Sequence, residues 1–167
     1  FIVTDNSADI LNVTSSGTVF NEDSGDRDFR VESNGNANMV FVDGGNDKVA
    51  IGTATATATL TVAGSAVAAT STAGSQSGST TLDFTANQNF VLTLTGNITL
   101  ANPTTEQVGQ SGMIVLIQDG TGSRTLAVGD QYFGPAGSVP TISTAANAVD
   151  IIPYVVMAAG KILLGAS

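Results

Sequence analysis

Acidic side chains and glycines are concentrated in "VDGGNDKVAIGT", residues 42–53, where Asp43 and Asp47 flank two glycines and an asparagine. Carboxylate oxygens in this density could bind a calcium ion. An EF-hand loop requires oxygen ligands at positions one, three and five and glycine at position six, whereas counting from Asp43 places Gly45 third and Lys48 sixth. The repeat of calcium β-rolls does not match either, and the stretch occurs once. We therefore predict a bend between two strands, with weak cation binding at Asp43 and Asp47 as the alternative.

The second half of the chain contains carboxylates that could pair for glycoside hydrolysis, which needs two carboxyl groups about 5–10 Å apart. They are Asp83, Glu106, Asp119, Asp130 and Asp150. Each stands beside a predicted turn or strand end, where a solvated acid is the usual case. The chain has no histidine and no cysteine, which removes the commonest general base, the commonest zinc ligand and thiolate chemistry. Ser111 and Lys161 match no catalytic motif. The sequence predicts no enzyme, no cofactor and no metal site.

Three residues are candidates for contact with a glycan or another receptor. In "DQYFGPAG", Tyr132 and Phe133 precede a loop rich in glycine and proline, where aromatic rings can stack on sugars. We favour a simpler interpretation, in which Phe133 belongs to the core and Tyr132 caps it. Arg124, in the turn "GTGSR", could hydrogen-bond an anionic sugar, although an exposed turn arginine is commoner.

Composition excludes several classes of partner. The 167 residues carry a formal net charge of −9, and the five basic residues are scattered, so neither nucleic acid nor an anionic membrane surface is an expected partner. The longest apolar stretch is far shorter than the roughly 18 residues that span a bilayer, so we expect no membrane insertion. Apolar residues make up 42% of the chain, so the charge does not indicate disorder. The chain opens on Phe1 rather than Met, so a missing leader would be invisible here.

Residues 1–62 read as short strands joined by tight turns. In "DFRVES", Phe29 and Val31 share one face, and Asn34-Gly35 after it is a strong hairpin signal before the return strand "MVFV". With "KVAI" these segments predict a β-meander. Large apolar side chains are few, so such hairpins are marginal alone, and we infer symmetric self-association.

The middle of the chain is of low complexity. "TATATAT", residues 53–59, alternates strictly and would place alanines on one face of a strand, as at the narrow axis of an intertwined oligomer. An extended linker is an equally good alternative. Residues 63–80 are almost entirely Ala, Gly, Ser and Thr and predict a flexible or extended connector.

Residues 81–167 predict the better core. About eight strand candidates follow one another with no amphipathic helix between them, which favours a β-sandwich of jelly-roll type. Gly96-Asn97 and the turn at residues 120–123 suggest two hairpins. "MIVLI" is a continuous apolar run, typical of a strand covered on both faces. Pro153 indicates an edge strand or a bulge.

Two stretches resemble known proteins. "FNEDSGDRDFRVESNGNANMVFVDGGNDKVAIGT" resembles a module of tail-fibre and other appendage proteins of tailed, particularly marine, bacteriophages. "LDFTANQNFVLTLTGNITLANPT", "GQSGMIVLIQDGTGSRTLAVGD", "VDIIPYVV" and "KILLGA" resemble a C-terminal domain of the same proteins. Ala50 departs from the family, which usually has glycine there.

The resemblance implies an all-β homotrimer of the virion, on the tail or as a capsid appendage, fibrous at its N-terminal end and globular at its C-terminal end. Its expected partners are copies of itself, other virion proteins and, for attachment, a host surface glycan or receptor. The alternative is a monomeric carbohydrate-binding or adhesin-like β-sandwich from a secreted bacterial protein.

Overall fold

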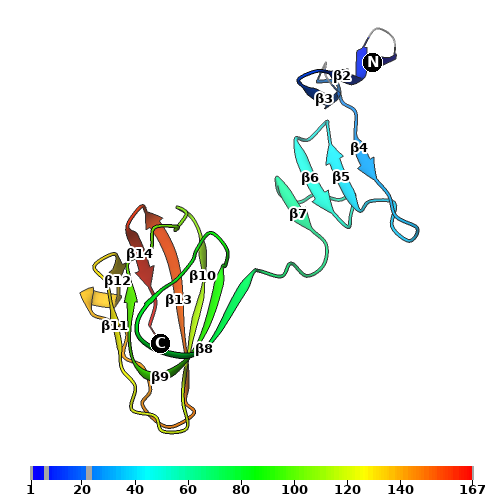
Figure 1. Cartoon of the computed structure of the whole chain (residues 1–167). Coiled ribbons are helices and arrows are strands. Elements are labelled where there is room, and N and C mark those ends of the chain that lie inside the picture. The colour runs from blue at the N-terminus through cyan, green and yellow to red at the C-terminus, as the bar shows by residue number, and fades with distance from the viewer. Residues whose placement is uncertain (1, 6–7, 22–23, 167) are drawn as a thin grey trace. The chain divides into compact units, whose positions relative to one another are not determined.

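The computed structural model describes residues 2–5, 8–21 and 24–166, which form two compact units, Phe1–Val67 and Ala68–Ser167 (Figure 1). Apart from one 3-10 turn at Pro135–Gly137, every regular element among the described residues is a β-strand. The prediction of an all-β protein is confirmed. No helix of the described chain is long and apolar enough to cross a membrane.

The first unit contains two small sheets. One has the order β1-β2-β3, formed by Ile2–Asp5, Ala8–Thr14 and Gly17–Phe20. The other has the order β4-β5-β6-β7, formed by Phe29–Val31, Val40–Asp43, Lys48–Ile51 and Leu60–Val62. Antiparallel pairing of β4 with β5 and of β5 with β6 confirms the predicted meander. Its hydrophobic interior is thin, because among the described residues of this unit only Phe41 and Ala50, which face each other across β5 and β6, are buried.

The alternating segment at residues 53–59 is a loop, not a strand. It carries the chain from β6 back to β7, which pairs with β6 in parallel and therefore needs a crossover. Thr61 Oγ1 accepts hydrogen bonds from the backbone N–H groups of Thr57 and Ala58, and Lys48 Nζ donates to the Ala56 carbonyl. Because threonine hydroxyls and a lysine bond this backbone locally, the period of two does not produce a strand.

The second unit is one seven-stranded sheet with the order β11-β9-β10-β13-β14-β12, and β8 pairs with the other edge of β9. The strands are β8 (Thr70–Thr81), β9 (Asn89–Ala101), β10 (Ser111–Gln118), β11 (Leu126–Val128), β12 (Tyr132–Phe133), β13 (Val149–Ala158) and β14 (Lys161–Leu164). Strands β8, β10 and β11 all run parallel to β9, whereas β13 is antiparallel to both β10 and β14.

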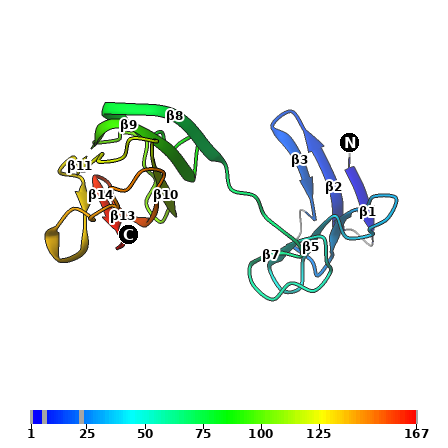
Figure 2. The ribbon, with the colours of Figure 1, turned by 90° about the horizontal axis from the view of Figure 1, so that it is seen from below.

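The expected two layers are parts of this single curled sheet. Strand β9 pairs with β10 through Phe90–Leu94 and with β11 through Ile98–Leu100, so it passes from one layer into the other. Figure 2 shows β8 following it along the side of the unit. The enclosed core is aliphatic with a small aromatic cluster: Leu82, Phe84, Phe90, Leu92, Leu94, Ile98, Leu100, Ile114, Leu116, Tyr132, Ile142, Ile152, Tyr154, Val156, Ile162 and Leu164.

Both hairpins predicted for this half are wrong. Gly96 lies inside β9, where a Cβ atom would come within 2.8 Å of the Ser77 Cβ on β8, so the glycine permits close approach of two strands. The turn at residues 120–123 exists, but the strand after it, β11, pairs with β9 and not with β10. Local turn residues reveal where the chain bends and not which strand it will join.

Part of the predicted connector, residues 63–80, is a strand, because residues 70–80 lie in β8. This strand carries almost no apolar side chain, and its long partner β9 supplies the core residues instead. Ladder irregularities occur around Gln76, with positive φ at Ser75 (54°) and Gly78 (69°). Such irregularities and polar side chains protect an exposed sheet edge against unwanted pairing.

The prediction of an edge or a bulge at Pro153 is wrong. Strand β13 lies between β10 and β14, and its irregularity falls at Val156–Ala158. The last β14 partner, Leu164, is opposite Tyr154, and Gly165 N–H donates to the Pro153 carbonyl at 2.7 Å. In an antiparallel strand, the nitrogen and the carbonyl of one residue point toward the same neighbouring strand. The Pro153 carbonyl points toward β14, so the Pro153 nitrogen, which carries no hydrogen, also faces β14 at the point where that strand ends.

Candidate receptor-binding loops

The two aromatic candidates lie on opposite faces of β12. Tyr132 is 5% exposed and belongs to the core, whereas Phe133 is 40% exposed and pairs with Leu163 of β14. The predicted arrangement, Phe133 in the core and Tyr132 capping it, is therefore reversed. Burial raises the pKa of the Tyr132 phenol far above its usual value, and the nearby Glu106 carboxylate adds to the shift. With its ring enclosed, Tyr132 has no free face on which a sugar could stack.

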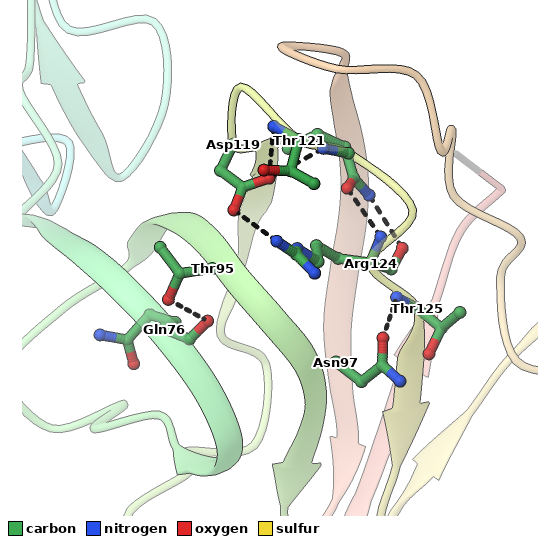
Figure 3. Close-up of polar contacts among 9 residues, drawn as sticks. Gln76, Thr95, Asn97, Asp119, Thr121, Arg124 and Thr125 are labelled. Carbon is green, nitrogen blue, oxygen red and sulfur yellow. Dashed lines mark hydrogen bonds and ion pairs between the residues drawn. The ribbon is translucent and has the colours of Figure 1, made fainter.

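Arg124 lies in the turn between β10 and β11, and its side chain is bonded to Asp119 of the same turn (Figure 3). Its guanidinium forms an ion pair with Asp119 at 2.8 Å, and the two side chains are 24% and 20% exposed. Asp119 Oδ1 also accepts the N–H groups of Thr121 and Gly122. The hydrogen bond from Arg124, and then that from Gly122, lower the pKa of Asp119. The turn is thus held by one carboxylate that remains ionised at neutral pH.

Gln118 fixes this turn to the rest of the unit, and sequence reasoning missed it. The side chain is 2% exposed. Its Oε1 accepts the N–H of Arg124 at 2.9 Å, and its Nε2 donates to the carbonyls of Arg124 and Ser143 at 2.9 and 2.8 Å. The sequence could have indicated its burial, because side chains two residues apart share one face of a strand, and in "MIVLIQD" Gln118 shares the face of the buried Ile114 and Leu116.

A hollow of about 250 Å³ lies beside the Arg124 turn. The loop before β13 forms its other wall, and the lining residues are Arg124, Thr125, Leu126, Val139, Pro140, Thr141, Ile142 and Thr144. Arg124 and several threonines line it beside an apolar floor, and such hydroxyl groups can hydrogen-bond a small polar ligand such as a sugar. The Arg124 guanidinium itself is directed toward Asp119 (Figure 3). Neither Tyr132 nor Phe133 lines the hollow, so the three sequence candidates do not form one site.

The five carboxylates of the second half are engaged locally. Asp83 accepts backbone N–H groups of its own turn, Glu106 accepts the N–H of Gly160, and Asp130 accepts the Asn102 amide. Asp150 accepts both the N–H and the hydroxyl of Ser143, and Asp119 holds the Arg124 turn. These contacts are those of acids that order turns and loops.

Within residues 42–53, the bend at residues 44–47 joins β5 to β6, as predicted. Asp43 accepts hydrogen bonds from the backbone N–H and the side-chain amide of Asn46, and Asp47 has a positive φ of 55°. A Cβ atom on Gly44 would collide with the Arg27 backbone, and one on Gly45 would collide with the Asp26 carboxylate. Across the described ranges, no group of three or more Asp, Glu, His or Cys residues is placed to hold a metal ion.

Comparison with known proteins agrees with this architecture. Residues 77–161 match the family model described as "Putative phage tail fibre C-terminal domain". The match covers 85 of the 167 residues and runs from within β8 to the first residue of β14. No curated protein and no solved structure matches the chain. The match extends over most of the curled sheet, including Gln118 and the Arg124 turn, and the chain therefore belongs to the phage tail fibre family, as a structural protein of the virion tail.

Proposed function

We propose that this tail-fibre chain works as a homotrimer and contributes to attachment of the phage to its host surface. The observation that carries the proposal is the contrast between the two units. A tail-fibre C-terminal domain with a well-filled core follows a unit whose described residues bury only Phe41 and Ala50. A unit with so little buried apolar area gains stability by sharing a core with copies of itself.

The exposed apolar side chains of the first unit support self-association. In the second small sheet Val31, Leu60 and Val62, and just before β5 Met39, are 42–63% exposed. Scattered single exposures are ordinary, but here they exceed the buried apolar residues of the unit. Association of identical chains would remove these side chains from water.

The hollow beside Arg124 is the proposed attachment point. Arg124 and several threonines line it in a protein whose net charge is −9, so Arg124 is the positive partner that an anionic sugar would meet there, in competition with Asp119. Phe133, exposed on β12, is a separate candidate contact.

The absolute mass of the full chain by light scattering tests the trimer. We expect about three times the chain mass of 16.7 kDa, stable on dilution. A dilution-stable single chain would contradict the shared-core argument and favour the second candidate, a monomeric carbohydrate-binding module. The hollow beside Arg124 supports this second candidate, because a monomeric module would bind its sugar there.

Binding of the full chain to oligosaccharides that contain uronic acids tests the attachment site. We expect Arg124→Gln to weaken binding, because Arg124 is the basic residue that lines the hollow. Arg30→Gln is the matched control, since Arg30 also forms an exposed ion pair, with Glu32, in the other unit. Equal binding by both variants would remove Arg124 from the proposed site.

A further inference from the structure

One face of the second unit is apolar although it is exposed. Strands β10, β13, β14 and β12 are consecutive neighbours in the sheet, and their outward side chains are mostly large and hydrophobic. Seven of these residues are 36–57% exposed and define what we call the outer face: Met113, Phe133, Val149, Ile151, Val155, Met157 and Leu163.

Strand register makes the outer face continuous. Across β10 and β13, Met113 is opposite Pro153 and Val115 is opposite Ile151. Across β13 and β14, Val155 is opposite Leu163, which in turn is the partner of Phe133 on β12. Side chains directly opposite on one face lie about 5 Å apart, so these neighbouring rows form one continuous apolar surface.

The same strands are also apolar on their inner side. Ile114, Leu116 and Ile152 alternate with the outward residues and are at most 1% exposed. A strand that faces water on one side normally alternates apolar with polar residues, and a strand covered on both sides is apolar throughout. The runs "MIVLI" and "IIPYVVM" are of the second kind, yet the described chain of this unit covers only one side.

The outer face carries almost no charge, which favours contact between identical chains. Among the outward positions of β10, β12, β13 and β14, all of which are described, the only charged residue is Lys161. Asp150 of β13 has the opposite parity and is bonded to Ser143. In a chain of net charge −9, a surface without carboxylates is where identical copies can approach without repulsion.

The size of the outer face also fits. Seven large side chains exposed to this extent present on the order of several hundred Å², about the largest apolar patch found on ordinary monomers. Stable interfaces bury roughly 800 Å² on each partner, which this face and its rim can supply. A shallow hollow between β13 and β14, lined by Pro153, Val155, Leu163 and Gly165 among others, offers a place for a neighbour's side chain.

We propose that the outer face is the surface through which copies of this chain associate in the C-terminal unit. The inference rests on the homotrimer proposed above and identifies where its chains meet. Copies of the chain therefore complete the second layer of cover that β10 and β13 lack.

Light scattering on the full chain and on Ile151→Glu provides the test. Ile151 lies toward one end of the outer face, is 50% exposed and points away from the core, so a charge there is tolerated in a single chain and buried only on association. We expect the wild type to have the mass of three chains and the variant to dissociate at concentrations at least about tenfold higher, with unchanged circular dichroism. Val67→Glu, at a residue 95% exposed and outside the outer face, should behave as wild type.

The outcomes separate the two proposals. A wild type with the mass of one chain overturns both, and this is also the result expected if residues 1–67 of the same chain covered the outer face. A wild-type trimer that Ile151→Glu leaves equally resistant to dilution overturns the outer face alone. If Ile151→Glu fails to fold, Met157→Glu, also 50% exposed on β13, repeats the test at the other end of the face.

Discussion

Replacing Gln118 by leucine tests how the Arg124 turn is held. The two side chains are similar in volume, so the substitution leaves little cavity, but it removes all three side-chain hydrogen bonds to Arg124 and Ser143. A buried hydrogen bond contributes about 1 kcal/mol, which gives a loss of about 3 kcal/mol. Burial of additional apolar surface by leucine offsets about 1 kcal/mol of this. We therefore expect a net loss of about 2 kcal/mol.

A loss of this size is large enough to measure by thermal unfolding. In a domain of 60–100 residues, 1 kcal/mol lowers the Tm by roughly 4–8 °C, so the transition of the second unit should fall by roughly 10 °C. The assay is circular dichroism of the full chain at one fixed concentration, because association would make the Tm concentration-dependent. Gln107→Leu is the matched control, since Gln107 is exposed and its side-chain amide donates only a long 3.5 Å hydrogen bond, to the Thr105 carbonyl.

The melting temperatures of the two variants can contradict this prediction. If Gln118→Leu melts within about 4 °C of Gln107→Leu, the three bonds contribute far less than this argument requires. A larger loss than predicted, with an altered near-ultraviolet spectrum, would mean that the turn and the loop before β13 rearrange together. In that case Gln118 would organise the hollow beside Arg124 as well as stabilise it.

Three further perturbations follow from the same contacts. Burial raises the pKa of Tyr154 to about 12 and that of Tyr132 higher, so the folded chain keeps protons that the unfolded chain releases near pH 10. Stability should therefore fall as the pH rises above about 10, with tyrosinate absorbance increasing only as the fold is lost; ionisation at pH 10 in a folded chain would refute this. Because the pKa of Asp119 is lowered in the folded chain, its ionised carboxylate stabilises the fold at pH values above the ordinary carboxyl pKa, and this stabilisation is lost as acid protonates the group. Asp119→Asn should therefore melt at a lower temperature than wild type at neutral pH and at the same temperature in acid. Gly44→Ala should destabilise the meander by on the order of 1–3 kcal/mol, because its Cβ would lie 2.3 Å from a backbone oxygen, whereas Gly35→Ala, with open space around it, should not; equal urea midpoints would contradict the close approach.

The sequence alone determined the class of the protein and much of its first unit. Alternation in residues 29–31 and the glycine- and aspartate-rich bend at residues 43–47 each depend on contacts within a few residues. The predicted two-residue hairpin turn at Asn34-Gly35 is wrong, because β4 and β5 are joined by a longer loop, residues 32–39. The absence of histidine and cysteine from the sequence limited the available chemistry in the same direct way. Such features are visible because turn geometry and side-chain alternation are local properties of the backbone.

Only the tertiary structure decided which strands pair and which residues meet. The polar segment at residues 70–81 becomes a strand because β9 presents a free edge to it, and Gly96 is a point of close approach rather than a turn. Tyr132 and Phe133 exchanged their expected roles because the parity of a two-residue strand is set by its partner, β14. Gln118 reaches Ser143 across 25 residues of sequence. Pairing, parity and long-range hydrogen bonds depend on contacts between distant segments, which no local pattern encodes.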